Sequence, residues 1–367
     1  MKIMHIGQLI GGLDIYIRNI VSSTSPDIEY VMLYGKDDNP HHEYFAKQNI
    51  TMHETNLCRQ LNPFNDIKAL SQILKYIKAE KPDIIHCHSA KGGFLGRVAG
   101  WITGIKTLYT PHAFSFLSTS SKLKSKIFKL LERLAVLDSY LLACSDSERE
   151  LGIKQVGYKE DKAIVWHNSI PSAANIQTAR PIADNVVRPS YICYMARPSY
   201  QKNPFFLLKV MNEVHKLMPD LRFCLLGVGY HSPNIEDLKE GIKMYGLSDC
   251  VDLHPWLSHD ESIEHIRNAK LYFSVSRYEG MSLTILEAMS LGKAIIASDV
   301  IGNKDCVFDG ENGYLLPFDA QLFANKIVDV IANDNLRKTL ETKSLEIFEE
   351  RFIIDKQIAQ LQQIYSA

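Results

Sequence analysis

The chain has 367 residues, which is long enough for two α/β domains of ordinary size. Its 41 basic and 42 acidic side chains give a formal net charge of −1, so no global charge draws it to nucleic acid or to anionic lipid. The seven cysteines are scattered, odd in number and mostly within apolar runs, which indicates reduced core residues and a cytoplasmic protein. No apolar run approaches the roughly 20 residues that span a bilayer, and the interrupted first residues do not form a signal peptide pattern.

A glycine-rich loop follows the first predicted strand, Lys2 to Ile6. Gly7, Gly11 and Gly12 precede an amphipathic run over residues 13–21. Glycines between a strand and a helix let a ligand approach the backbone closely, although a plain tight turn uses the same residues. The spacing departs from the dinucleotide-binding fingerprint, which disfavours a dehydrogenase.

Histidines lie at the ends of later predicted strands, where parallel sheets bind ligands. His86 and His88 stand two residues apart on one strand face, which suggests a metal, but the sequence shows no obvious set of further ligands. We therefore expect no metal, with His88 merely lining a cleft. His112 follows the strand at 106–110, and its imidazole can exchange a proton or bond a sugar hydroxyl. A satisfied structural histidine is the alternative.

Residues 120–134 form a predicted amphipathic helix with a basic face. Leucine and isoleucine recur at helical spacing, and the polar positions carry Lys122, Lys124, Lys126, Lys129 and Arg133. Such a helix suits an anionic membrane surface, at about 1 kcal/mol for each cation near the lipid. A core helix with a solvated lysine face has the same pattern.

Composition changes between residues 171 and 189, where Ala, Asn, Pro and Arg occur without periodicity. This segment is expected to link a domain of residues 1–170 to a second domain of residues 190–349. Early in the second domain, Arg197 and Lys202 stand between a strand end and a helix start. The pair can hold a diphosphate, by bidentate and point-charge contacts, or remain surface cations.

The segment from Leu271 to Gly292 predicts a buried strand, a turn at Gly280 and a helix that Ser282 caps. The orphan N–H groups and the dipole at such a helix start favour an anion. Glu287 lies within an otherwise apolar helix and needs a hydrogen-bonding partner, which bound hydroxyls can supply. Glu279 precedes the turn and is expected to face the same ligand.

These features resemble the E-x7-E signature of retaining glycosyltransferases of family 4, which have the GT-B fold. Glu279, Gly280 and Glu287 match the signature within its strand, turn and helix, while Ser282 and Ala294 stand where the family often has Gly and Pro. The resemblance extends over essentially the whole chain. It includes the N-terminal glycine loop, the T-x-H-A sequence at His112 and the R-x4-K pair at Arg197 and Lys202.

The resemblance implies two Rossmann-like parallel-sheet domains facing a cleft, with a last helix at about 350–367 packing back on the first domain. It implies that Glu279 contacts the donor sugar, that Glu287 binds the nucleotide ribose and that His112 contacts the donor sugar or phosphate. Catalysis is then assigned to His112, Glu279, Arg197 and Lys202. Donor binding is assigned to Gly12, Arg197, Lys202, Gly227, Glu279, Gly280, Met281, Ser282, Leu283 and Glu287, and the acceptor side to Asp14, Asn19 and His88.

The function that follows is transfer of a sugar from a nucleotide-sugar, expected to be a UDP-sugar, to a hydroxyl of a lipid-linked or polysaccharide precursor. Retention of configuration is implied by the resemblance, and no metal or other cofactor is expected. We expect a cytoplasmic protein that can lie on the inner face of the membrane through residues 120–134. The alternatives are a sugar-nucleotide epimerase of the same fold and a non-catalytic partner subunit of a transferase.

Overall fold

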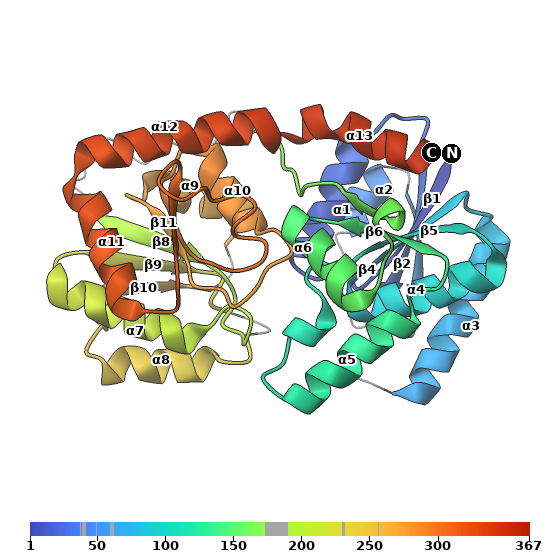
Figure 1. Cartoon of the computed structure of the whole chain (residues 1–367), viewed down its shortest axis with the longest axis horizontal. Helices are drawn as coiled ribbons and strands as arrows, with labels where there is room; N and C mark the ends of the chain where they lie inside the picture. The colour runs from blue at the N-terminus through green and yellow to red at the C-terminus, as the bar shows by residue number, and fades with distance from the viewer. Residues whose placement is uncertain are drawn as a thin grey trace. The chain divides into compact units, whose positions relative to one another are not determined.

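The computed structural model describes residues 1–36, 38, 42–48, 50–58, 62–172, 190–229, 232–255 and 257–367. The backbone divides into two units (Figure 1). Unit 1 contains residues 1–170 together with 354–367, and unit 2 contains residues 171–353. Most of the segment expected as a linker, 173–189, and also Trp256 lie outside the described residues.

Unit 1 is built on a seven-stranded sheet in the order β3-β2-β1-β4-β5-β6-β7, and all its described pairings are parallel. The strands are β1 (Lys2–Ile6), β2 (Glu29–Gly35), β3 (Thr51–Thr55), β4 (Ile84–His88), β5 (Lys106–Thr110), β6 (Ser139–Ala143) and β7 (Ala163–Val165). The helices are α1 (Gly12–Ser23), α2 (His42–Lys47), α3 (Pro63–Glu80), α4 (Ser89–Thr103), α5 (Lys122–Leu134), α6 (Asp146–Leu151) and α13 (Ile354–Ser366), with short turns at Ser115–Leu117, Gly152–Val156 and Glu160–Lys162.

The two faces of this sheet are covered by different helices. Apolar side chains of α1 and α13 form one core with the sheet face that carries Ile3, Tyr30 and Ile84. Helix α4 lies against the other face, and its glycines permit the close approach. A Cβ on Gly93 would lie 2.1 Å from the Tyr109 ring, so a larger residue there would push the helix off β5.

Unit 2 has a six-stranded sheet in the order β10-β9-β8-β11-β12-β13, whose described pairings are again parallel. The strands are β8 (Tyr191–Met195), β9 (Arg222–Leu226), β10 (Val251–His254), β11 (Tyr272–Ser274), β12 (Ile295–Ser298) and β13 (Gly313–Leu316). The helices are α7 (Pro204–Leu217), α8 (Ile235–Met244), α9 (His259–Asn268), α10 (Leu283–Ser290), α11 (Ala320–Ala332) and α12 (Asp334–Arg351). One face packs against α7, α8 and α11 in a large apolar core.

Parallel sheets bury both faces, which is why the strands are almost continuously apolar. The prediction of two Rossmann-like α/β domains is confirmed by these two sheets. The last helix begins at Ile354, a few residues after the predicted start, because α12 continues to Arg351.

Helix α5 matches the predicted basic amphipathic segment, but most of its apolar side chains are exposed. Leu123, Ile127, Leu130 and Leu134 are 70%, 46%, 55% and 63% exposed, and Glu132 is the one buried residue of the helix. The core-helix alternative therefore fails for these four side chains, whereas Leu131 is half-buried. Within the part of the chain that the structure describes, every helix is too short or too polar to cross a membrane.

Candidate functional site

The predicted strand, turn and helix around Glu279 are present in unit 2. Strand β11 ends at Ser274, and α10 begins at Leu283 after a buried turn. Ser282 caps the helix, because its side chain accepts a hydrogen bond from the backbone N–H of Ile285 at 3.4 Å. The first turn of α10 thus lies beside the carboxyl ends of parallel strands, where ligands of open α/β sheets bind.

Glu279 is 6% exposed and is held by two neighbours. Its Oε1 lies 2.5 Å from Nζ of Lys202, and its Oε2 accepts a hydrogen bond from Nε2 of Gln201 at 2.9 Å. The structure therefore brings together two predicted residues that are 77 positions apart in sequence. Gly302 makes room for them, since a Cβ at that position would lie 2.7 Å from the Glu279 carbonyl oxygen.

Glu287 is 4% exposed within the apolar helix α10, and one of its oxygens has a partner that the sequence did not reveal. Nε2 of His259, the first residue of α9, lies 3.0 Å from Oε1 of Glu287. The second oxygen, Oε2, is buried and has no hydrogen-bond partner among the described residues. A buried carboxylate oxygen in this state can accept a hydrogen bond from a ligand hydroxyl.

Arg197 and Gly227 follow neighbouring strands, β8 and β9. A Cβ on Gly227 would lie 3.8 Å from the backbone nitrogen of Arg197, so the two turns are adjacent. Gly227 has φ of +79°, which L-residues rarely adopt. The loop between Arg197 and Lys202 is anchored by Tyr194, whose hydroxyl donates to the Lys202 carbonyl at 2.8 Å.

The remaining predicted donor residues fall into two groups. Gly280, Met281 and Ser282 are buried in the turn before α10, and Leu283 begins that helix half-buried. Gly12 belongs to unit 1, where it is exposed at the start of α1.

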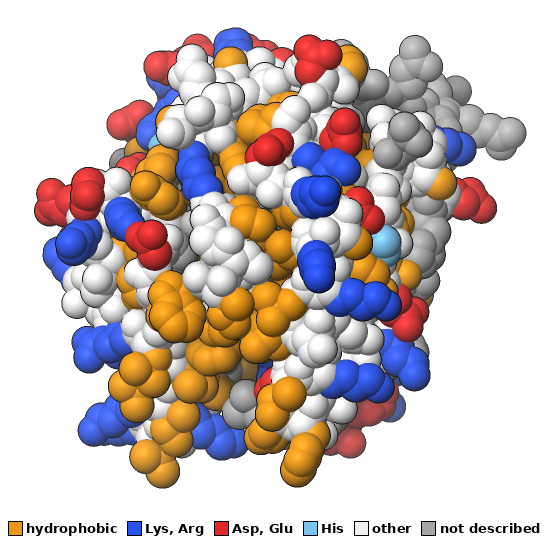
Figure 2. All heavy atoms as spheres, turned by 90° about the vertical axis from the view of Figure 1, so that its right-hand side faces the viewer, with side chains coloured by type: hydrophobic (Ala, Val, Ile, Leu, Met, Phe, Trp, Pro, Cys, Tyr) orange, Lys and Arg blue, Asp and Glu red, His pale blue; other side chains and the backbone are white. Residues whose placement is uncertain are grey.

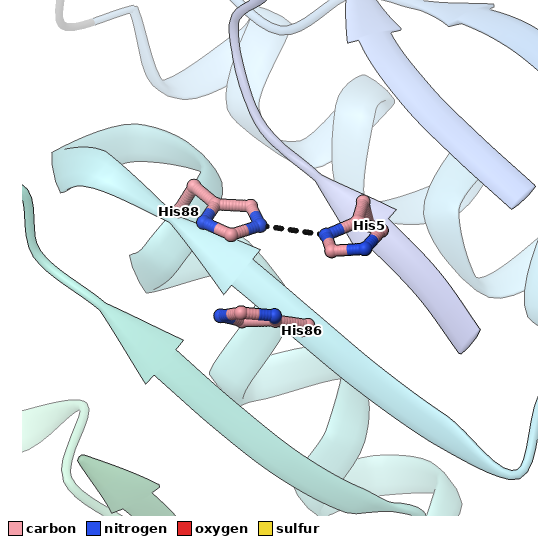
Figure 3. A group of neighbouring side chains, drawn as sticks. All are labelled: His5, His86 and His88. Atoms are coloured by element: carbon pink, nitrogen blue, oxygen red, sulfur yellow. Dashed lines mark hydrogen bonds between the residues drawn. The ribbon is translucent and has the colours of Figure 1, made fainter. Parts of the chain in front are cut away.

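Unit 1 gathers four histidines at the carboxyl ends of its central strands. His5, His86 and His88 are fully buried and point toward one another from β1 and β4 (Figure 3). Nδ1 of His5 lies 2.8 Å from Nε2 of His88, and Nδ1 of His88 lies 3.2 Å from Nε2 of His112. His86 hydrogen-bonds the hydroxyls of Tyr365 at 2.9 Å and Thr110 at 2.8 Å. We call these four histidines the histidine cluster.

The sequence pattern does not place His5 near His86 and His88, because only the pairing of β1 with β4 brings them together. The three side chains are of a type and proximity that could hold a metal ion. Two nitrogens on a tetrahedral zinc would be about 3.3 Å apart. The 2.8 Å separation of His5 and His88 is instead that of a hydrogen bond.

Burial holds the histidine cluster neutral. Desolvation lowers the pKa of His5 to about 3 and the pKa values of His86 and His88 well below their usual range. A neutral imidazole has one donor and one acceptor, so the chain from His5 through His88 to His112 has a single direction. Nε2 of His5 has no partner among the described residues. A lone pair costs less to bury there than an N–H, which assigns the proton to Nδ1 of His5.

With that direction, His88 donates from Nδ1 to Nε2 of His112, and Nδ1 of His112 faces the Cys144 sulfur at 3.5 Å. His112 itself has an unusual backbone. His112 and Ala113 have φ of +52° and +78°, a region that costs a non-glycine residue about 1–2 kcal/mol. Backbone strain of this kind is typical of functional sites.

Glu148 holds this strained loop. It is fully buried at the start of α6, and its two oxygens accept hydrogen bonds from the backbone N–H groups of Ala113 at 2.7 Å and Cys144 at 2.8 Å. Ser145 and Glu148 have the S-x-x-E spacing of a helix start, a signal that would have located the helix. It would not have shown that Glu148 reaches the loop of His112.

The predicted acceptor residues are only partly brought together. His88 lies within the histidine cluster beside His112. Asp14 is buried on α1, where Arg18 Nε lies 2.8 Å from its Oδ2. Asn19 is half-buried further along α1, and its carbonyl accepts a hydrogen bond from Ser22.

Family models match both parts of the chain. Residues 175–346 match the model of "Glycosyl transferases group 1", and residues 10–174 match that of "Glycosyltransferase Family 4". The chain belongs to the family 4 glycosyltransferases of GT-B fold.

Among curated relatives, the UDP-Gal:alpha-D-GlcNAc-diphosphoundecaprenol alpha-1,3-galactosyltransferase of Escherichia coli is 27% identical over 351 residues, covering 91% of this chain and 88% of that protein. The O-antigen biosynthesis glycosyltransferase WbnH of E. coli is 25% identical over 243 residues, 66% of each chain. Among solved structures, Anabaena Alr3699/HepE in complex with UDP and glucose has a TM-score of 0.82 at 19% identity and covers both chains fully. This last likeness concerns the fold.

Replacing Ala113 by glycine should stabilise the protein, because glycine adopts the positive φ without strain. The gain is expected to be up to about 1 kcal/mol after the extra entropy of glycine in the unfolded chain is subtracted. It can be measured as a rise in the urea midpoint. Ala90→Gly, at an exposed position in the first turn of α4, is the matched control and should lower the midpoint. Equal losses in both variants would contradict the strain argument.

The histidine cluster should make unit 1 sensitive to acid. Unfolded histidines bind protons near pH 6.5, whereas His5 in the folded unit resists protonation down to about pH 3. The contribution of the buried neutral histidines to the free energy of unfolding is therefore fully present above about pH 6.5. It falls as the pH drops, by about 1.4 kcal/mol per pH unit for each proton that the unfolded chain binds and the folded chain does not. Urea midpoints across this range should fall less steeply for His5→Gln than for wild type. A His215→Gln control, outside the cluster, should keep the wild-type slope, and an unchanged slope in His5→Gln would refute the assignment.

Proposed function

We propose that the protein transfers a sugar from a UDP-sugar to a hydroxyl of a lipid-linked precursor of a cell-surface polysaccharide, with retention of configuration and without a metal. The observation that carries this proposal is the pair of buried carboxylates in unit 2. Glu279 forms an ion pair with Lys202, and Oε2 of Glu287 is buried without a hydrogen-bond partner among the described residues. The relative that acts on a diphosphoundecaprenol-linked sugar supports the acceptor class.

The donor diphosphate would be neutralised by groups of unit 2. Lys202 already faces an anion, Glu279, at 2.5 Å, and its position at the strand ends lets it meet a phosphate as well. Arg197 follows the neighbouring strand and offers a planar guanidinium, which suits phosphate oxygens. The N–H groups at the start of α10 add a favourable dipole. These three sources of positive potential would stabilise the leaving diphosphate directly.

The ribose would bind at Glu287. Its Oε1 is occupied by His259, so Oε2 is the oxygen left for a ribose hydroxyl. The donor sugar would contact Glu279 beside it in the turn before α10. This division keeps both carboxylates hydrogen-bonded once the donor is present, which offsets the cost of burying them.

The proposed chemistry is same-face substitution through an oxocarbenium-like state. The bond from the anomeric carbon to the phosphate oxygen breaks, the acceptor oxygen bonds to that carbon from the same side, and the departing phosphate takes the acceptor proton. His112 is proposed to contact the donor sugar or phosphate, in line with the resemblance. Its Nε2 accepts from His88, so the cluster would fix the orientation of its ring.

Donor binding can be tested by thermal stabilisation, because a ligand that binds the folded state raises its stability. UDP and UDP-sugars should raise the melting temperature without added Mg²⁺ or Mn²⁺, more than ADP or GDP do. Glu287→Ala should lose the stabilisation, since it removes the oxygens proposed to hold the ribose. Glu213→Ala, on α7 away from this turn, should retain it.

No stabilisation by any nucleotide in the wild type would favour a non-catalytic subunit. Incubation with the donor alone separates the other alternative, because an epimerase would form the epimer without acceptor. For a transferase, proton NMR of the product should show the anomeric configuration of the donor. An inverted product would contradict the proposed retention.

Helix α5 is the proposed membrane-binding element. Its exposed leucines and isoleucine lie on a helix whose polar positions carry five cations, and large apolar side chains are also exposed on α3 and α4 at Phe64, Ile67, Trp101 and Ile102. On the face drawn in Figure 2, hydrophobic side chains gather in the lower half with Lys and Arg side chains beside them. An apolar surface with a basic border suits the interface of an anionic membrane.

Charge reversal should test this surface. Lys122→Glu, Lys124→Glu and Lys126→Glu together should weaken binding to anionic phospholipid vesicles by about 100-fold or more, at about 1 kcal/mol per lost cation. Sedimentation with vesicles measures the binding, and neutral vesicles should show little difference. Reversal of the exposed Lys338 and Lys343 on α12 is the control. Unchanged binding of the triple variant would remove the membrane proposal while leaving the donor site untouched.

A further inference from the structure

A second group of metal-binding side chains lies in unit 2, on the sheet face opposite the large apolar core. Cys193 on β8 and Cys224 on β9 are register partners in a parallel pair, so their side chains share one face. His254 pairs with Leu226, two residues beyond Cys224, and therefore shares that face too. His265 comes from α9.

The ligand atoms of three of these residues converge. Ligand atoms of Cys224, His254 and His265 all lie within 4.8 Å of one another. The rings of His254 and His265 are 4.4 Å apart between centroids, and Cys193 stands in register beside Cys224 on the neighbouring strand. Sγ of Cys224 lies 3.6 Å from Nδ1 of His265.

That last distance is the informative one. A tetrahedral zinc with a Zn–S bond of about 2.3 Å and a Zn–N bond of about 2.05 Å separates its sulfur and nitrogen ligands by about 3.5 Å. The separation of the Cys224 sulfur and the His265 nitrogen therefore suits two ligands of one ion, as it also suits a hydrogen bond between thiol and imidazole. In the histidine cluster of unit 1, the 2.8 Å between Nδ1 of His5 and Nε2 of His88 is too short for two ligands of one ion.

Packing alone gives little reason for this arrangement. The opposite face of the sheet is filled by large apolar side chains. Beneath α9 the sheet instead carries two cysteines and a histidine, and Ile263 and Ile266 are the only apolar residues buried in that helix. Both cysteines are buried, whereas His254 and His265 are half-buried, which leaves the group open to an ion from solvent.

We propose that Cys224, His254 and His265, with Cys193 as the adjacent fourth ligand, bind a divalent zinc-like metal ion. Thiolate and imidazole together favour zinc over magnesium, calcium or manganese. Binding would release the thiol proton of each coordinating cysteine to solvent. The ion would join α9 to β8, β9 and β10.

The site has a structural consequence for the donor-binding residues. Helix α9 carries His265 in its second half and His259 at its first residue, where His259 bonds Glu287. An ion that fixes α9 on the sheet would therefore also fix the partner of Glu287. This role is positional and separate from the proposed metal-independent chemistry at the donor phosphates.

The test uses the full chain, freed of metal with a chelator and kept reduced. Titration with Zn²⁺ should give one ion per chain, and Co²⁺ should give the charge-transfer absorption of a thiolate–cobalt bond. Cys224→Ser with His265→Asn should lower the zinc affinity by about tenfold or more. Cys250→Ser with His215→Asn, in the same unit but outside the group, should bind as the wild type does.

A second measurement does not depend on a variant that folds. Zn²⁺ should slow the alkylation of Cys224 in the wild-type protein, as mapped by mass spectrometry. The alkylation rate of Cys58 in unit 1 should not change. Equal zinc affinity in both double variants, or a cobalt complex without thiolate absorption, would overturn the proposal. So would a disulfide between Cys193 and Cys224 in the freshly isolated protein, because it would remove both thiolates.

Discussion

A carboxylate buried without a partner costs several kcal/mol, and this constraint organises both units. The buried glutamates have partners of different kinds. Glu279 pairs with Lys202, Glu287 with His259, and Glu148 with two backbone N–H groups. Glu132 pairs with the equally buried Arg97 at 2.7 Å. These partners tie the turn before α10, helix α9 and the loop of Ala113 to the sheets.

The two units use polar burial in opposite ways. Unit 2 keeps its site charged, with Lys202 against Glu279 and Arg197 nearby on the neighbouring strand. Unit 1 keeps its site neutral, because burial suppresses protonation of His5, His86 and His88. Cationic side chains attract an anion, whereas the buried neutral imidazoles orient one another through hydrogen bonds.

The fold, and the placement of several candidate site residues at strand ends, could be predicted from sequence because they depend on local pattern. Alternating strands and helices predict parallel sheets, and the glutamates near Gly280 mark a strand, turn and helix. Partners that arrive through strand pairing could not be predicted: His5 beside His88, His259 beside Glu287, and Glu148 beneath Ala113. The exposure of α5 could not be predicted either, because amphipathic spacing does not show whether the apolar face meets a core or the solvent.

The order of the chain has a consequence for how the protein folds as it is synthesised. The core of unit 1 includes Ile354, Ile358, Leu361 and Tyr365 of α13, and Tyr365 bonds His86, which is 279 residues earlier. All of unit 2 is made before these side chains leave the ribosome. Unit 2 can therefore fold before α13 packs against the core that α1 forms in unit 1. Until α13 is complete, the apolar side chains of that core remain exposed and can aggregate.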